Sequence, residues 1–396
     1  MSAPSTHGGV GRRIAYYRSV VRPKMTQQRL ADTARVALGT IRKIERGERG
    51  VTDTTLEAIA AALGVDPARL RTDRRSTHSA VHDALPSLSA ALAAYDVPED
   101  GPVRPLRNLR ATVAEAVRWR LAAQYTRMAR ELPDLLAELA RAYHSASAHE
   151  RRELAGLLVN AYRSADAVAY KFGALDLSAR LVELMRWVAP EAEDPLLTAA
   201  VAYVRTETFF AARAHATGLR VLERAIDDTP ASSTASEAAA RGALHMRAAV
   251  IAGRACDAGA ARTHLAEARA LAEQVAEGVY CGTSFGPDSV RVHEVSVAVG
   301  LGAGHVGHAL AVAREWKPPT DLPAERHSGF YIELARAQLW SGLVDQAFES
   351  LKLARRIAPQ HTREHPWVRA DAATLCRLKR AGSESLTHFA QWCSAT

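Results

Sequence analysis

The basic residues of this 396-residue chain are concentrated at one end. The first 75 residues contain 15 Lys and Arg against 7 Asp and Glu, whereas the rest of the chain contains 36 of each sign. The net charge of +8 therefore lies entirely in the first fifth of the chain. Clustered cations neutralise the phosphates of a nucleic acid. The charge distribution predicts a nucleic-acid-binding module, with a solvated basic surface as the alternative.

One segment has the residue types of a metal-dependent hydrolase. His361, Glu364 and His365 spell HxxEH, an inverted metalloprotease motif. That chemistry requires one continuous helix that holds both histidines on the same face. Pro359 precedes the segment and Pro366 follows it, which argues against such a helix. We therefore expect a solvated loop between helices, and no metal site.

A second histidine group lies around the stretch LGAGHVGH. His293, His305 and His308 form a ligand cluster only if they converge, and a tight turn between helices is the favoured alternative. The glycines do not follow a strand, so the sequence does not support a nucleotide-binding loop. The cysteines form no CxxC pair, which argues against a zinc site or a disulfide framework and favours a reducing cytoplasm; they are Cys256, Cys281, Cys376 and Cys393. We expect no catalytic site and no cofactor.

Composition predicts that helices position these residues. Hydrophobic residues make up 48% of the chain and aromatic residues 6%, which excludes a disordered protein. Plentiful Ala and Leu with few β-branched runs favour helix over strand. No stretch approaches 18 uncharged apolar residues, and the start lacks the apolar region of a signal peptide. We expect an all-α protein with no membrane contact.

A repeat pattern runs through the long second part of the chain. The tetratricopeptide (TPR) pattern has a small residue, an apolar residue four later, a small residue three after that, and often Pro five further on. Ser178, Val182, Met185 and Pro190 fit it. Units that begin at Gly218 and Ala347 also have the Pro, the unit at Ala261 lacks it, and the unit at Ala309 is a weaker match. The five units recur 38 to 48 residues apart, with a generic helical bundle as the alternative.

The N-terminal stretch TQQRLADTARVALGTIRKIERGERGVTDTTLEAIAAALGV has a denser pattern. Its apolar, capping and turn positions match one helix-turn-helix pattern in a single register. The matching residues are Thr26, Gln27, Leu30, Ala31, Val36, Thr40, Ile41, Ile44, Glu45, Gly47, Leu56, Ile59, Ala60, Leu63, Gly64 and Val65. In this the chain resembles the Xre/Cro family of helix-turn-helix repressors. The resemblance implies a lambda-repressor-like domain over residues 1–75. Frequent Ser, Pro, Gly and Asp predict a linker over 76–105, with a short helix around Leu85 to Ala94. The repeat pattern predicts a TPR-like α-solenoid over 106–396.

The resemblance also assigns the DNA contacts. It places one helix in the major groove, where base edges can be distinguished. The residues facing the bases are Ala37, Leu38, Gly39, Arg42 and Lys43, with Thr40 replacing Ala37 as the cap if the helix starts later. Gln27 is placed like the family's phosphate-contacting glutamine, and we expect Arg46 and Arg49 to contact phosphates as well.

The stretch departs from the family at two positions. Arg35 stands where the family usually has Gly in the turn, which is tolerable if the turn is not left-handed. Ala37 stands where Ser or Thr normally caps the helix, at a cost of about 1 kcal/mol. The loop before Thr26 is about two residues longer than usual, so a structural pair between Arg18 and Glu45 is uncertain in register.

The second part of the chain resembles the TPR half of large bacterial Xre-type regulators, in segments such as KFGALDLSARLVELMRWVA. The resemblance implies dimerisation or ligand sensing. Candidate residues on the concave face are Asn160, Arg163, Tyr203, Arg205, Arg247, His293 and Tyr331. We therefore expect a cytoplasmic, homodimeric DNA-binding repressor with a palindromic operator and a peptide or small-molecule effector. The alternative is a TPR adaptor with a weakened DNA-binding head.

Overall fold

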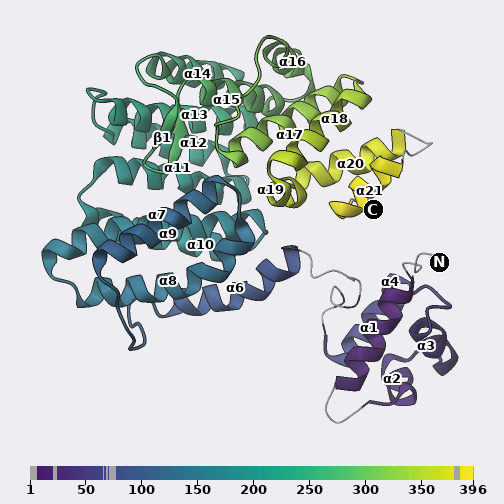
Figure 1. Cartoon of the computed structure of the whole chain (residues 1–396). Helices are drawn as coiled ribbons and strands as arrows, with labels where there is room; N and C mark the ends of the chain where they lie inside the picture. Colours follow the sequence, from purple (N-terminus) through teal and green to yellow (C-terminus); the bar gives the residue numbers. More distant parts are fainter. Residues whose placement is uncertain are drawn as a thin grey trace. The chain divides into compact units, whose positions relative to one another are not determined.

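The computed structural model describes residues 7–20, 25–65, 67, 70, 77–378 and 384–395. The chain divides into two compact units, residues 1–79 and 80–396, which we call the head and the body (Figure 1). Both are helical, as the composition predicts. Among the described residues, no helix has the length and the apolar character that crossing a membrane requires.

Four helices of the head enclose a small apolar core. They are α1 (His7–Val20), α2 (Gln27–Ala34), α3 (Leu38–Glu45) and α4 (Asp53–Leu63). Ile14, Leu30, Ile41 and Ile59 are each 0% exposed in this core. Helical spacing of the apolar residues brings one face of each helix inward. The helical domain that the resemblance implies is confirmed.

Local signals begin and end these helices. The side chains of Thr26 and Thr52 accept hydrogen bonds from backbone N–H groups three residues on, which caps α2 and α4. Gly64 ends α4 with a positive φ of 66°. Arg35 ends α2 at φ 52°, so the turn is left-handed after all, and this Arg adopts a conformation that favours glycine.

The first half of the expected linker is instead a helix. α6 (Thr77–Ala93) places Val81, Leu88 and Leu92 in the apolar core of the body, each at most 1% exposed. We expected only a short helix within a linker over residues 76–105. The apolar spacing of the stretch gives it a buried face, which outweighs its Ser, His and Pro content.

The body consists of antiparallel helix pairs. The pairs are α7 (Leu106–Leu121) with α8 (Tyr125–Ser145), α9 (Ala148–Lys171) with α10 (Leu175–Val188), α11 (Pro195–Ala211) with α12 (His215–Asp228), α13 (Ala235–Arg254) with α14 (Ala258–Ala272), α15 (Pro287–Gly300) with α16 (Val306–Glu315), α17 (Ala324–Trp340) with α18 (Val344–Ile357), and α20 (Pro366–Leu378) with α21 (Glu384–Trp392). Short helices η1 (Ala189–Ala192), η2 (Ala303–His305) and α19 (Pro359–Glu364) lie between pairs.

Successive pairs stack through their first helices. α9, α11, α13, α15 and α17 each pack on the next, which is the arrangement of a TPR-like α-solenoid. The five anchors of the repeat pattern all lie in second helices, where small residues permit close packing. Gly218 illustrates this, because a Cβ there would lie 2.4 Å from Ile251 Cδ1. The predicted repeats are thus confirmed as helix pairs.

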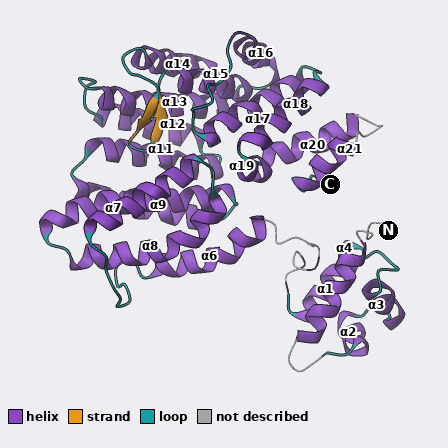
Figure 2. Cartoon of the chain, in the orientation of Figure 1, coloured by secondary structure: helices purple, strands orange, loops and turns teal. Residues whose placement is uncertain are grey.

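One β-hairpin interrupts the helices of the body (Figure 2). β1 (Gly278–Tyr280) pairs antiparallel with β2 (Thr283–Phe285), and residues 281–282 form the turn. Cys281 and Gly282 both have positive φ, 45° and 71°, which suits a two-residue hairpin turn. The sequence analysis did not predict this hairpin.

Residues far apart in the chain meet inside the body. The backbone N–H and the hydroxyl of Thr126, at the start of α8, donate to Gln360 Oε1 at 3.0 and 3.2 Å. Lys171, at the end of α9, pairs with Glu325 of α17 at 2.6 Å. Early and late helix pairs of the solenoid are therefore in direct contact.

Candidate functional site

Helix α3 has one buried face and one exposed face. Ile41 and Ile44 lie in the core of the head, at most 2% exposed. Gly39, Arg42 and Lys43 are exposed, and their spacing places them together on the opposite face. A Cβ at Gly39 would meet no described atom within 4 Å, so a large partner can approach this face closely.

The start of α3 settles which residues lie on that face. The helix begins at Leu38, after Ala37, whose side chain makes no capping hydrogen bond. Thr40 is thus inside the first turn and does not cap a helix that starts later, so that alternative is wrong. Ala37 is exposed, whereas Leu38 is only partly exposed because it packs against the core of the head.

A polar network fixes α3 to its neighbours. Arg18 Nε and Nη2 of α1 donate to the two carboxylate oxygens of Glu45 at 2.8 and 3.0 Å, so the expected pair is confirmed. This hydrogen bonding raises the pKa of Arg18. Gln27 Nε2 also donates to Glu45, at 2.7 Å. The amide that we expected on a phosphate is therefore engaged inside the head, where it joins α2 to α3.

Further cations follow α3. Arg46 pairs with Glu48 at 3.0 Å, and both side chains are at least half exposed. Arg49 is exposed as well. An exposed pair of this kind is worth at most about 1 kcal/mol. Both arginines are therefore accessible to an anionic partner.

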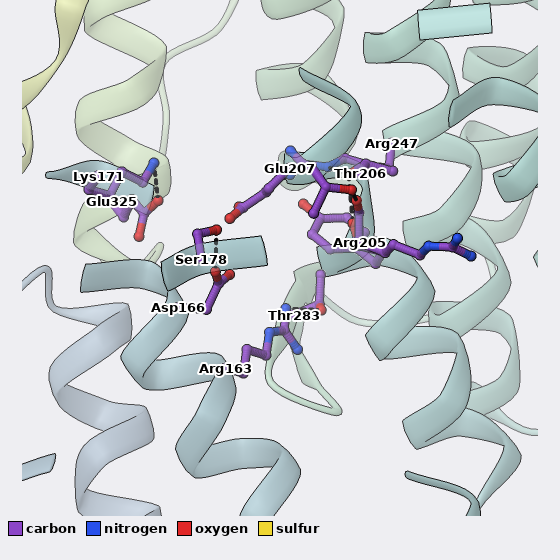
Figure 3. A network of polar contacts seen from close by, with 12 residues as sticks. Arg163, Asp166, Lys171, Ser178, Arg205, Thr206, Glu207, Arg247, Thr283 and Glu325 are labelled. Carbon is purple, nitrogen blue, oxygen red and sulfur yellow. Dashed lines mark hydrogen bonds and ion pairs between the residues drawn. The ribbon is translucent and has the colours of Figure 1, made fainter. Parts of the chain in front are cut away.

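In the body, the structure brings five of the seven candidate ligand residues together, of which Arg163 and Arg247 are labelled in Figure 3. Arg163 lies 5.8 Å and Arg247 4.7 Å from the ring of Tyr203. The Tyr203 hydroxyl accepts from Arg326 Nη2 at 3.3 Å, and Arg326 Nη1 lies 3.0 Å from His293 Nε2. Asn160 lies one turn before Arg163 on α9, close to Gly282. We call this cluster the interior site.

Two candidates lie elsewhere. Arg205 is stacked 5.5 Å from the ring of Phe209 and points away from Glu207 (Figure 3). Tyr331 packs against His327 and Phe330 in the apolar core of the last repeats. Neither residue belongs to the interior site, because the sequence does not give the rotational phase of each first helix.

The sequence analysis missed half of the interior site. Arg120 of α7, Lys171, Glu207, Glu325 and Arg326 belong to it, and their partners lie 40 to 162 residues away in sequence. Charged side chains on helices are usually exposed to solvent, and these come from four different helices, α7, α9, α11 and α17. Only the packing of these helices against one another brings the side chains together.

Cations dominate the electrostatics of the interior site. Burial raises the pKa of Tyr203, but Arg326, Arg247 and Arg163 outweigh burial and lower it to about 8. Burial lowers the pKa of Arg163 to about 9, and the nearby Arg120 adds to this. Burial raises the pKa of Asp166 well above its usual range. Lys171 outweighs burial at Glu325 and lowers the pKa of that carboxyl.

The HxxEH segment is buried, not solvated. His361 and Glu364 of α19 are 3% and 6% exposed, and α19 ends before His365. The Nδ1 of His361 lies 2.7 Å from Ser328 Oγ. His305 and His308 are exposed around a turn between α15 and α16. Within the described ranges, no group of three or more His, Cys, Asp or Glu side chains could hold a metal ion.

The comparisons with known proteins agree with this reading of the head. Residues 22–70 match the helix-turn-helix family model. The head is therefore a helix-turn-helix domain, in which α2 and α3 are the two helices of the motif. No curated protein matches the chain.

Two solved structures have distant similarity. One is PlcR from Bacillus thuringiensis in complex with the peptide PapR7 and DNA, at 12% identity over 67% of this chain and 95% of that chain, with a TM-score of 0.24. The other is the apo form of the competence regulator ComR from Streptococcus vestibularis, at 14% identity over 94% of this chain and 99% of that chain, also with a TM-score of 0.24. Similarity at this level assigns neither a fold nor a ligand to this chain.

Proposed function

We propose that the protein is a sequence-specific DNA-binding transcriptional regulator. The observation that carries this proposal is the exposed face of α3 in a helix-turn-helix domain with a net charge of +8. Arg42 and Lys43 on that face donate to guanine O6 and N7 in the major groove. Arg46 and Arg49 contact the flanking phosphates. Ala37, Leu38, Gly39 and Thr40 form the surface that approaches the groove.

The body then has two roles in this proposal, dimerisation and sensing. One head of this size reads few base pairs, and two heads read a palindromic operator with half-sites one helical turn, about 34 Å, apart. A peptide or small-molecule effector that binds the body shifts the balance between states with different head spacing, and so changes operator affinity. The four cysteines are free thiols, in keeping with a cytoplasmic location. The proposal assigns no catalytic step.

The test begins with duplexes selected from a random pool by the full-length protein. Arg42→Ala with Lys43→Ala should weaken binding of the selected duplex by about 1–3 kcal/mol per lost contact and relax its sequence preference. Arg356→Ala, which removes an exposed cation of the body, is the matched control. Retention of the same sequence preference by the double variant would refute the assigned face and favour an adaptor protein that acts through protein partners.

The phosphate contacts have a separate signature. Arg46→Ala and Arg49→Ala should weaken binding equally for all sequences. Each lost contact should also reduce the slope of log K against log salt by about 0.9 per head. A change of sequence preference in either variant would move that residue from the phosphates to the bases.

A further inference from the structure

The turn of the β-hairpin is held by two arginines of the interior site. Arg120 Nη2 donates to the carbonyl oxygen of Gly282 at 2.8 Å, and Arg163 Nη1 donates to that of Cys281, also at 2.8 Å. Arg163 Nη2 donates to Thr283 Oγ1 at 2.7 Å. Two guanidinium groups, from α7 and α9, thus donate to the carbonyl oxygens of two consecutive residues. The same N–H donors bind carboxylate oxygens in arginine–carboxylate pairs.

These acceptors do not match the charge of the arginines. Every hydrogen-bond acceptor that the described residues offer to Arg120 and Arg163 is neutral. The Nε of Arg120 is buried with no partner among the described residues, and this residue is 8% exposed. Charge-assisted hydrogen bonds are about twice as strong as neutral ones. An anion in place of the two carbonyl groups would therefore be held more strongly.

The interior site as a whole also has excess positive charge. Lys171 and Arg247 pair with Glu325 and Glu207, at 2.6 and 3.3 Å. Asp166 accepts from Ser178 at 2.6 Å rather than from a cation. With Asp166, which interacts with Arg163 and Glu207, and Glu277, which interacts with Arg326, the site has four carboxyl groups against five cations. The cations are Arg120, Arg163, Lys171, Arg247 and Arg326.

The hairpin is also fixed at its base, by contacts that do not involve the two arginines. Phe285 is 0% exposed and fills the space beside Gly242, where a Cβ would lie 1.9 Å from its ring. Glu277 accepts from Ser284 Oγ and from the backbone and hydroxyl of Ser289 at 2.6 to 3.1 Å. The strands have three residues each, so they add little stability of their own. None of these contacts at the base involves Arg120 or Arg163, so they would persist if the turn left the arginines.

We propose that Arg120 and Arg163 form a carboxylate-binding site, which the turn of the β-hairpin occupies until a carboxylate ligand displaces it. The ligand class is an organic anion, either a free small acid or the C-terminus of a peptide. The proposal rests on the proposed function only in taking the body as the sensing part. The hairpin then acts as a tethered competitor, so ligand binding and movement of the turn are one event.

Cys281 in the turn reports on this movement. The full-length protein is treated with N-ethylmaleimide in acetate or in acetamide at equal ionic strength, and labelling is read on the peptide that contains Cys281. Exposed Cys256 serves as the internal reference. Acetate, and not acetamide, should raise the rate at Cys281 on the order of tenfold, as expected when charge-assisted bonds replace neutral ones. Equal rates in the two solutions overturn the proposal.

Variants locate the effect. Arg163→Gln should abolish the response to acetate, whereas Arg205→Gln, a cation outside the interior site, should keep it. Gly282→Ala should raise labelling without acetate, because a Cβ there would lie 2.9 Å from Arg120 Nη2 and 3.2 Å from Arg163 Nη1. Gly278→Ala in the same hairpin meets only ordinary contacts at 3.4 Å and should change nothing. An acetate response that survives in Arg163→Gln overturns the assignment.

Two further comparisons distinguish a small acid from a peptide C-terminus as the ligand, and the carboxylate-site proposal from the DNA-binding proposal. N-acetylalanylalanine with a free C-terminus is compared with its C-terminal amide. A stronger effect of the free acid than of acetate indicates a peptide C-terminus, and an equal effect indicates a small acid. Labelling reads the body and duplex binding reads the head, so the failure of one proposal is distinguishable from the failure of the other.

Discussion

The head contains two Arg–Glu pairs that differ in burial, which permits a quantitative test. The side chains of Arg18 and Glu45 are 18% and 6% exposed, and those of Arg46 and Glu48 are 61% and 50% exposed. Glu45→Gln keeps the shape of the side chain but leaves the buried guanidinium with a neutral acceptor, at a cost of about 2 kcal/mol. Glu48→Gln should cost at most about 0.5 kcal/mol.

Hydrogen exchange of the full-length chain, read by mass spectrometry, measures both changes in place. Two kcal/mol corresponds to an increase of about 30-fold in the opening equilibrium of the head. Glu45→Gln should therefore accelerate exchange in peptides from α2, α3 and α4 by about this factor, and leave peptides of the body unchanged. Glu48→Gln should change exchange by about twofold or less. Equal effects of the two variants would refute the reasoning that burial decides the worth of these pairs.

Two further predictions concern the body. Burial lowers the pKa of His245 to about 4 and also lowers that of His264, whose Nδ1 lies 3.0 Å from Nδ1 of His245. The folded state then binds fewer protons than the unfolded state, so the free energy of unfolding should fall as the pH decreases from about 6.5 to 4. His264→Gln should flatten this pH dependence, measured by urea unfolding at several pH values. Gly242→Ala would place a Cβ 1.9 Å from Phe285 Cζ and should destabilise the body by about 1–3 kcal/mol, whereas Gly329→Ala meets no described atom within 4 Å and should stabilise it by up to about 1 kcal/mol. Equal melting temperatures for the two alanine variants would contradict this.

The head was predictable because its signals are local. Thr26, Gly47 and Gly64 mark helix ends within a few residues of the helices that they limit, and Ile41 and Ile44 repeat at helical spacing. The exposed face of α3 follows directly from this. The role of Gln27 was not predictable, because its partner Glu45 lies 18 residues away on another helix. The left-handed Arg35 was also missed, since a turn that holds an arginine there depends on the packing of α2 against α3.

In the body, the sequence predicted the helix pairs but not which side chains form the interior site. Small residues such as Gly218 and Ala347 identify the second helices, because close packing within a pair leaves a local pattern. Which side chains of the first helices face inward depends on the rotation of each helix, and Arg205 and Tyr331 show how easily this is misjudged. The β-hairpin was missed because three-residue strands leave no periodic signal. Its turn is held by Arg120, 162 residues earlier in the chain.

The contacts of Thr126 with Gln360 and of Lys171 with Glu325 have a consequence for how the body folds. In an open repeat array each unit touches only its neighbours, so stability is close to a sum over neighbours and folding can begin anywhere. In this body the two contacts close loops of more than 150 residues. Forming them is slow, because the chain must lose conformational entropy before the contacts stabilise it. Removal of the last repeats should therefore loosen the first ones, and the body should unfold as one cooperative unit instead of fraying from its end.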